Sequence, residues 1–392
     1  MQHTPDPILS YGDLTWPEIA ELPRDAALFL PLGLEAIDAA QLRRWAHSDL
    51  QVMLPAVPYG FRRRDAHRLG ALAVAPGLFR RVLRGIVRGL TAQGFSNVLI
   101  VDGHRAAQEL KEPGVRVVQA KTHAEAASLW PEDLSGRIAV ISTGHVEQHG
   151  YHLPTATDTL IVQALADGLA RSRPDEVICL PAWPYGVSTH THEFPATLDL
   201  GGRVFEDFFL AIVGRLVGLG VEMVYFSNGH GGNHSYLVNV VKRAGERWPQ
   251  TFTATEWLHT TGPSLESLRQ SGRGGMGHGG ELETSYLLHL RPELVKMERA
   301  TVETDFISTP NYFMDWIEGG RLIANPPWSD DTRSGLYGDG TLGTAEKGRA
   351  WLQAAIAERV ESVEEIRQQH ARRTARRRRR EEGAGPLPAQ DS

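Results

Sequence analysis

The chain has 392 residues, of which 41% are hydrophobic and 22% are charged, and its formal net charge is −6. These values are typical of a globular protein with room for two domains and sizeable buried cores. No run of eighteen or more apolar residues occurs, which excludes a membrane-spanning helix of ordinary length.

The N-terminal residues and the cysteine content bear on where the protein is found. The opening sequence MQHTPDPILSYGD lacks the basic and then apolar order of a secretory signal. The single cysteine, Cys179, lies in the apolar run VICL, so it cannot form an intrachain disulfide and is expected to be a reduced core thiol. We therefore predict a cytoplasmic protein with no membrane partner.

Strand-like and helix-like runs alternate along the middle of the chain. Short apolar runs bounded by polar or turn residues predict strands over 138–142, 176–180, 222–227 and 251–257. Apolar residues at helical spacing predict helices over 158–171, 204–219, 236–248 and 344–369. This alternation predicts a three-layer α/β/α fold, in which helices cover both faces of a mostly parallel sheet.

An internal repeat overlaps this region. Residues 54–104 align with residues 180–230 without a gap at a constant offset of 126, and fifteen of the fifty-one positions are identical. The matches include LPAVPYG against LPAWPYG and the Gly-His pair that ends each segment. Upstream, residues 28–38 resemble residues 139–149, but the stretch that follows is shorter. We interpret the pattern as a duplication that produced two tandem copies of one fold.

The C-terminal residues are strongly basic. From Ala371 onward there are seven arginines and three acidic residues, and five of the arginines form the run Arg376–Arg380. Such runs occur in nucleic-acid contacts, but no basic residues alternate with aromatic ones elsewhere in the chain. Gly, Pro, Ala and Gln follow, so we predict a disordered tail over 371–392 and no nucleic-acid partner.

The segment STGHVEQHGYHLPTATDT, residues 142–159, carries the first group of candidate site residues. Glu147 and His149 are two apart after a predicted strand, so they face the same way in extended backbone. Asp158 stands at the predicted start of a helix, where a cap is the simpler role for its carboxylate. Two carboxylates and an imidazole on one short loop also suit a divalent metal ion, which is the interpretation we prefer.

Two glycine-rich segments follow. SNGHGGN, residues 227–233, comes directly after a strand and centres on His230. A phosphate-binding loop is the alternative, but no Lys-Ser/Thr pair follows it. GMGHGGELETS, residues 275–285, opens a helix in which His278 is a candidate acid or base. Glu281 is either a cap or a partner of His278, and Glu281 and Glu283 cannot share a helix face.

These motifs, in this order, resemble the creatininase family. The family pattern runs GSxEQHGPHLPxxTD, YGxSxxHxxFPGT, NGHGGN and HAGExETS, and here it reads TGHVEQHGYHLPTATD, YGVSTHTHEFPAT, NGHGGN and HGGELETS. The ending LYGDGTLGTAEKG is also similar, so the resemblance covers about 138–369. Tyr151 and Ala196 replace a proline and a glycine of the pattern, which bears on the substrate more than on the reaction.

The resemblance implies a metal-dependent amidohydrolase with two divalent ions per chain, Zn, Mn or Fe. Asp158 would bridge the ions, and Glu281 would supply the ligand that some members carry where this chain has Gly232. The implied metal ligands are Glu147, His149, Asp158, His230 and Glu281, and the implied catalytic residues are His278 and Glu281. The expected substrate-binding residues are Trp183, Tyr185, Ser188, His190, His192, Asn228 and Asn233.

The expected reaction is hydrolysis of a C–N bond other than a peptide bond, in a cyclic amide, a lactam or a similar small molecule, by water that two metal ions activate. The family also includes deformylases and a peptidase of a biosynthetic pathway, so formamide or peptide hydrolysis is the alternative. A non-catalytic scaffold or binding protein is a third hypothesis, which the intact ligand set disfavours.

The first copy lacks most of these ligands. Ala36 and Asp38 take the places of Glu147 and His149, and His104 corresponds to His230. We therefore predict a degenerate creatininase-like domain over 1–125, a catalytic domain over 126–370 and the tail. The degenerate copy is expected to be a structural partner or a regulator, in a homo-oligomer or an intrachain pseudo-dimer.

Overall fold

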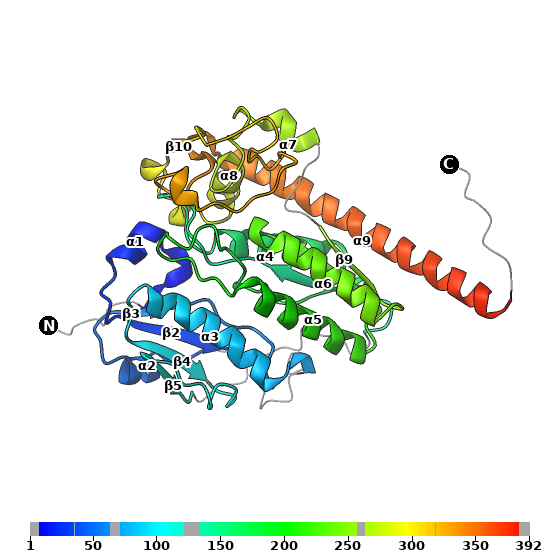
Figure 1. The fold of residues 1–392 in the computed structure, drawn as a ribbon, viewed down its shortest axis with the longest axis horizontal. Coiled ribbons are helices and arrows are strands. Elements are labelled where there is room, and N and C mark those ends of the chain that lie inside the picture. The colour runs from blue at the N-terminus through cyan, green and yellow to red at the C-terminus, as the bar shows by residue number, and fades with distance from the viewer. Residues whose placement is uncertain are drawn as a thin grey trace.

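The computed structural model describes residues 8–34, 36–62, 71–120, 134–256, 263–317 and 319–383. Within these ranges two parallel sheets form the body, the first built from the N-terminal part of the chain and the second from its middle (Figure 1). The predicted boundary between the copies, near residue 125, falls outside the described residues. No helix in the described ranges is both long and apolar enough to cross a membrane.

The first sheet has five parallel strands in the order β1-β3-β2-β4-β5. Alternate residues of β2 reach opposite faces, so that Leu28 and Leu30 pack with α3 whereas Phe29 packs with α2. The elements are β1 (Leu9–Ser10), α1 (Trp16–Glu21), β2 (Ala27–Leu32), α2 (Ala39–Ala46), β3 (Gln51–Met53), α3 (Pro76–Ala92), β4 (Val98–Asp102) and β5 (Val115–Val118).

The second sheet has four parallel strands in the order β7-β6-β8-β9. Ile138 and Val140 of β6 pack with α4 and α9, whereas Ala139 and Ile141 face the core shared with α5 and α6. The elements are β6 (Ile138–Thr143), α4 (Thr157–Ser172), β7 (Val177–Cys179), α5 (Gly202–Gly218), β8 (Met223–Asn228), α6 (His234–Arg247) and β9 (Phe252–Thr255). Helices cover both faces, as the apolar runs predict.

A third group of elements lies beside the carboxyl ends of the second sheet's strands. Helix α8 packs against both α4 and α9, and a small antiparallel pair, β10 and β11, adjoins it. The bounds are α7 (Pro263–Leu268), α8 (Glu281–Leu290), β10 (Val302–Glu303), β11 (Gly338–Asp339) and α9 (Ala345–Glu381).

The two sheets confirm the duplication seen in the sequence. The order β3-β2-β4-β5 of the first sheet repeats as β7-β6-β8-β9 in the second, with β1 as an added edge strand. Helices α3 and α5 begin and end at an offset of 126 residues, as do β3 and β7. The bridge between Leu32 and Val57 also recurs, between Thr143 and Trp183. The mostly parallel α/β fold predicted for two tandem copies is therefore confirmed.

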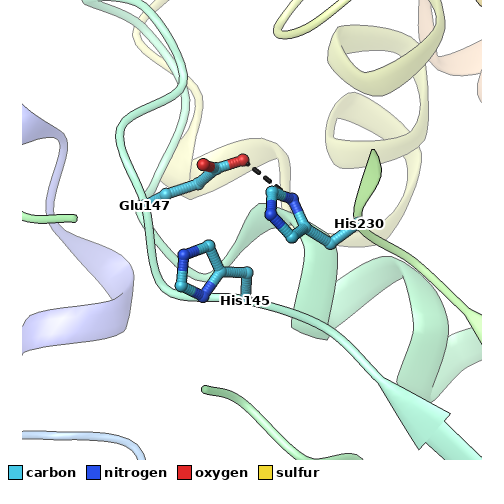
Figure 2. A group of neighbouring side chains, drawn as sticks. All are labelled: His145, Glu147 and His230. Carbon is cyan, nitrogen blue, oxygen red and sulfur yellow. Dashed lines mark ion pairs between the residues drawn. The ribbon is translucent and has the colours of Figure 1, made fainter. Parts of the chain in front are cut away.

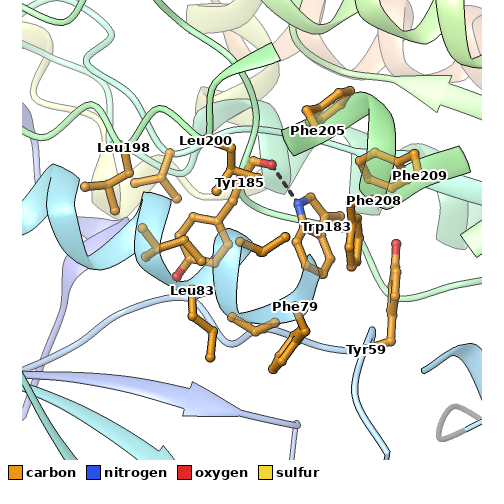
Figure 3. Packing of buried hydrophobic residues seen from close by; sticks show 14 of the residues in the cluster. Tyr59, Phe79, Leu83, Trp183, Tyr185, Leu198, Leu200, Phe205, Phe208 and Phe209 are labelled. Atoms are coloured by element: carbon orange, nitrogen blue, oxygen red, sulfur yellow. Dashed lines mark hydrogen bonds between the residues drawn. The ribbon is translucent and has the colours of Figure 1, made fainter. Parts of the chain in front are cut away.

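The two copies share one hydrophobic core, which Figure 3 shows at close range. Helix α3 of the first copy packs against α5 of the second. The ring of Trp183 lies 5.3 Å from that of Tyr59 and 4.4 Å from that of Phe208, measured between centroids. Tyr185 crosses the same boundary, because its hydroxyl donates a hydrogen bond to the carbonyl oxygen of Pro55. The two copies are thus held together by a continuous hydrophobic core.

The N-terminal segment before β2 leaves the first copy and contacts the second. The carbonyl oxygens of Gly12 and Leu14 accept hydrogen bonds of 2.9 Å from the backbone N–H groups of Ala156 and Thr155. Further along, the indole Nε1 of Trp16 donates to the carbonyl oxygen of Ser334. This segment therefore lies against the loop that leads into α4.

The basic C-terminal segment differs from the prediction. Helix α9 begins near the predicted position but continues to Glu381, so residues 371–381 are helical rather than disordered, whereas 384–392 lie outside the described residues. Arginine is a good helix former, and positive charge at a helix C-terminus is favourable. Arg373 also stacks on Phe252, and Arg377 hydrogen-bonds Gln250. The last turns project away from the body (Figure 1).

Candidate metal centre

The site lies where the central strands of the second sheet end. Strands β6 and β8 are paired as far as Thr143 and Asn228, so the loops that follow them begin side by side. The first loop carries Glu147 and His149 and leads into α4, in whose first turn Asp158 stands. His230 is the second residue after β8. Ligand sites in open α/β sheets form at this edge, as the sequence predicts here.

Asp158 lies between two histidines. Its Oδ1 is 3.1 Å from His149 Nε2, and its Oδ2 is 3.1 Å from His230 Nδ1. Glu147 Oε1 is 3.0 Å from the same nitrogen of His230. Glu147 Oε1 and Asp158 Oδ2 are buried and have no hydrogen-bond partner, because these short contacts lack hydrogen-bond geometry. The structure therefore brings together four of the five predicted ligands around unsatisfied carboxylate oxygens.

Three histidines are held in the orientation that metal-ligating histidines adopt. His149 Nδ1, His230 Nε2 and His278 Nε2 lie 3.2, 3.0 and 2.7 Å from the backbone carbonyl oxygens of Glu147, Val187 and Gln148. A carbonyl oxygen only accepts, so each of these nitrogens carries the proton. The other ring nitrogen of each neutral histidine then presents a lone pair to the carboxylates.

His145 also belongs to the cluster, although the sequence interpretation did not include it. Ligand atoms of His145, Glu147 and His230 lie within 4.8 Å of one another (Figure 2). Its ring is oriented differently, because Nδ1 accepts a hydrogen bond from Gly186 N–H at 2.8 Å. The proton of the neutral ring is therefore on Nε2, which is buried without a partner. The sequence did contain a signal for His145, because the family pattern has serine at this position and this chain has histidine.

Glu281 is not among these residues, which corrects the expectation that it supplies a ligand and assists His278. Its carboxylate forms an ion pair of 2.6 Å with Lys347 Nζ and accepts hydrogen bonds from the backbone of Gln270 and Ser271. Glu283 takes the expected place, with Oε2 3.8 Å from His149 Nε2. His149, Asp158 and Glu283 form one of the groups that could hold a metal ion.

The spacing argument itself was sound, because residues two apart on α8 do face different ways. It did not indicate which face of α8 meets the metal centre. Lys347 decides this, since it stands in the first turn of α9 and α8 packs against that helix. The lysine of the motif TAEKG was the signal that could have identified the partner of Glu281.

The predicted substrate-binding residues divide into three groups. Trp183 and Tyr185 are fully buried in the core between the copies, which corrects their assignment to a pocket. Their aromatic surface is used for packing (Figure 3). His192 is exposed, and its Nδ1 lies 2.6 Å from the carbonyl oxygen of Thr189 in its own loop, so it faces away from the cluster.

The other predicted residues lie at the site. Ser188 Oγ donates a hydrogen bond of 2.6 Å to Glu147 Oε2, which holds the carboxylate. Asn228 bonds the backbone of His230 through both side-chain atoms, and Asn233 joins Val187 N to Gly144 O. These three side chains position the loops.

His190 lies at the edge of the cluster, beside a wall of aromatic rings. Trp328 stands between two histidines, with its ring centroid 4.4 Å from that of His190 and 5.0 Å from that of His278. Phe194 and Tyr337 complete this cluster, and Trp16 packs against it from the N-terminal segment. Trp16 and Trp328 were not singled out in the sequence.

The carboxylates of the cluster favour positive charge beside them. Burial opposes protonation of His149, but Asp158 and Glu283 outweigh it and raise the pKa of His149 to about 9. The pKa of His230 is likewise raised, since Glu147 and Asp158 outweigh its burial. Burial instead lowers the pKa of His278 to about 3, so this ring is neutral. Burial raises the pKa of Glu283 to about 7.

Fold and site together define a class of protein, an α/β protein whose parallel strands end at a buried cluster of histidines and carboxylates of the kind that holds divalent cations. The profile of the creatininase family, described as creatinine amidohydrolase, matches residues 12–135 and again residues 130–363. The chain belongs to the creatininase family. The two matched segments agree with the two copies in the structure.

Several relatives are hydrolases. The mycofactocin precursor peptide peptidase of Mycobacterium ulcerans (strain Agy99) is 29% identical over 253 residues, which cover 63% of this chain and 88% of that protein. The peptidase of the same name from Mycobacterium tuberculosis (strain CDC 1551 / Oshkosh) is 32% identical over 57% of this chain and 83% of its own length. Creatinine amidohydrolase of Pseudomonas putida is 23% identical over 58% of this chain and 89% of its length.

Among solved structures, a manganese form of creatininase superposes with a TM-score of 0.50 at 21% identity, covering 59% of this chain and 91% of that one. A crystal structure of creatinine amidohydrolase gives a TM-score of 0.50 at 22% identity, over 58% and 90% of the two chains. These likenesses show the fold. Each covers a little over half of this chain, as expected if a single-copy protein matches one of two copies.

Proposed function

We propose that the second copy hydrolyses an amide C–N bond at a centre of two divalent metal ions. His230, Glu147 and Asp158 would hold one ion, and His149, Asp158 and Glu283 the other. The observation that carries the proposal is the orientation of the histidines, each tied to a backbone carbonyl so that its second nitrogen faces carboxylates. Asp158 fits the bridging role because each of its oxygens faces a different histidine.

Zn, Mn and Fe all accept this mixture of carboxylate and imidazole ligands. When bound, such ions polarise a carbonyl group and make water a stronger nucleophile near neutral pH. The unsatisfied, buried oxygens of Glu147 and Asp158 fit this role, because a buried polar atom without a partner otherwise destabilises the fold. The residues present therefore suit a pair of divalent ions.

His278 would transfer the proton during hydrolysis. Its Nε2–H donates to Gln148 O, which leaves Nδ1 as a lone pair 3.5 Å from Glu147 Oε1. A neutral ring accepts a proton from attacking water and passes it to the leaving nitrogen. His145 would present Nε2–H to the oxygen on which negative charge develops.

Members of the family act on different classes of substrate. For this chain we favour a peptide over a small cyclic amide. The relatives that share 29% and 32% identity with this chain are named as peptidases, whereas creatinine amidohydrolase shares 23%. This preference revises the expectation, drawn from the motifs, that the bond is not a peptide bond. The direct test is turnover by the metal-loaded protein of short peptides and of creatinine, followed by mass spectrometry.

Asp158→Asn is the control, because it preserves shape but removes a charge shared by both proposed ions. Cleavage of a peptide by the wild type alone would support the proposal, and ring opening of creatinine alone would support the small-amide alternative. If neither activity appears in protein shown to hold metal, the result would favour the third hypothesis, a binding protein.

A further inference from the structure

A cavity of about 530 Å³ lies in the first copy, where β4 ends and α3 begins. This volume is within the range of small-molecule sites. Six of its lining residues correspond to two loops of the candidate metal centre in the second copy. The residues Gly60, Phe61, Arg62, His104, Arg105 and Ala106 stand 126 positions before Gly186, Val187, Ser188, His230, Gly231 and Gly232.

The chemistry of the two sites is opposite. In the second copy the position of Arg62 is held by Ser188, which bonds the carboxylate of Glu147. In the first copy the counterpart of Glu147 is Ala36, and the counterpart of His149 is Asp38, which caps α2. The carboxylate of Glu147 thus has no acidic counterpart in the lining, and guanidinium groups take the place of a hydroxyl and a glycine.

The lining carries an excess of positive charge. Arg80 forms an ion pair of 2.7 Å with Glu109, which is the one acidic side chain among the described residues that line the cavity. Arg62 and Arg105 are exposed, and no hydrogen bond or ion pair joins either side chain to another described residue. Arg105 also has a φ of 63°, a left-handed conformation that residues with a side chain rarely adopt. His104 is 5% exposed and lies against the ring of Phe61.

We propose that this cavity binds a small organic anion through its carboxylate or phosphate group. The planar guanidinium group donates parallel hydrogen bonds that match both kinds of oxyanion. Phe61, Val74 and Phe79 back the cavity with apolar side chains that are almost fully buried in the core. The first copy has therefore exchanged a cation site for an anion site at the same place in the fold. This inference does not depend on the reaction of the second copy.

Calorimetric titration of the full chain with succinate and, separately, with inorganic phosphate tests the proposal and distinguishes the two oxyanions. The titrations use the Asp158→Asn background, so that anions cannot bind metal in the second copy. Replacing both arginines by the residues of the second copy, Arg62→Ser with Arg105→Gly, should weaken binding about tenfold or more. The matched control is Arg43→Ser with Arg44→Ser, two exposed arginines of α2 outside the cavity.

Saturable binding of one anion per chain that the control retains and the double variant loses would support the anion site. Arg62→Glu alone provides a second measure, because reversing one charge should also abolish binding. The proposal is overturned if neither probe binds below about 10 mM, which is weaker than most specific sites. It is equally overturned if binding survives in the Arg62 and Arg105 variants.

Discussion

The ammonium group of Lys347 lies 2.6 Å from the carboxylate of Glu281, and both groups are buried beneath the junction of α8 and α9. The ion pair holds Glu281 away from the metal centre. Glu283, two residues further along, faces His149 instead. Two acidic residues of one motif therefore have different roles. One joins helices, and the other is available to a metal ion.

Substitution of each glutamate should separate these roles. Glu283→Gln should reduce the metal content from roughly two ions per chain to roughly one, because it removes a charged ligand from one ion only. Glu281→Gln should keep the metal but lower the stability by roughly 3 kcal/mol, since Lys347 is left buried without its counter-charge. Elemental analysis and thermal unfolding of both variants measure the two effects. Loss of metal in the Glu281 variant alone would restore the original assignment.

Asp158→Ala should lose both metal ions. Its two oxygens face different histidines, so its removal takes a ligand from each proposed ion. Elemental analysis after dialysis, with wild-type protein treated in parallel, gives the metal content directly. Full occupancy in this variant would mean that the carboxylate does not bridge.

Metal affinity should rise with pH. Metal binding requires the free lone pair of His149, but in the metal-free protein its pKa is about 9, so the ring is protonated at neutral pH. Glu283, with a pKa of about 7, must also lose a proton below neutrality. Each displaced proton adds about tenfold in apparent affinity per pH unit, and the dependence should be steeper below about pH 7. Competition with a chelator of known affinity measures this slope, and a flat profile would contradict it.

His145→Ser, which restores the residue of the family pattern, should lower kcat while leaving the metal content unchanged. The imidazole Nδ1 is occupied by the N–H of Gly186, so only the protonated Nε2 faces the cluster. Loss of one such donor typically costs on the order of 100-fold in kcat. The melting temperature of the variant, compared with that of the wild type, is the control for folding. Loss of metal from this variant would instead identify His145 as a ligand.

The fragment 126–392 should be poorly soluble or should self-associate. Its α5 face packs against α3 in the intact chain, so removal of the first copy exposes Trp183, Phe208 and Leu198 to water. The backbone contacts of Gly12 and Leu14 with the loop before α4 would be lost as well. Size-exclusion chromatography with light scattering checks this outcome. A soluble, active monomer would show that the first copy is dispensable for packing.

The sequence alone was sufficient for the duplication and for most of the second copy's elements. Apolar periodicity and the offset of 126 residues are local properties, and the helices and strands formed near their predicted positions for that reason. The motifs also contained Glu147, His149, Asp158 and His230, because ligands on loops after adjacent parallel strands meet at one sheet edge.

Tertiary structure decided what local spacing leaves open. Whether Glu281 or Glu283 faces the cluster depends on Lys347, which is 66 residues from Glu281 in the chain. Trp183 and Tyr185 follow a strand, as pocket residues often do. In the structure the first copy covers them, because burying their apolar surface stabilises the fold more than leaving it exposed to a ligand site would. The arginine-rich segment is helical because α9 is already nucleated and anchored by packing upstream, and extending a helix costs far less than starting one.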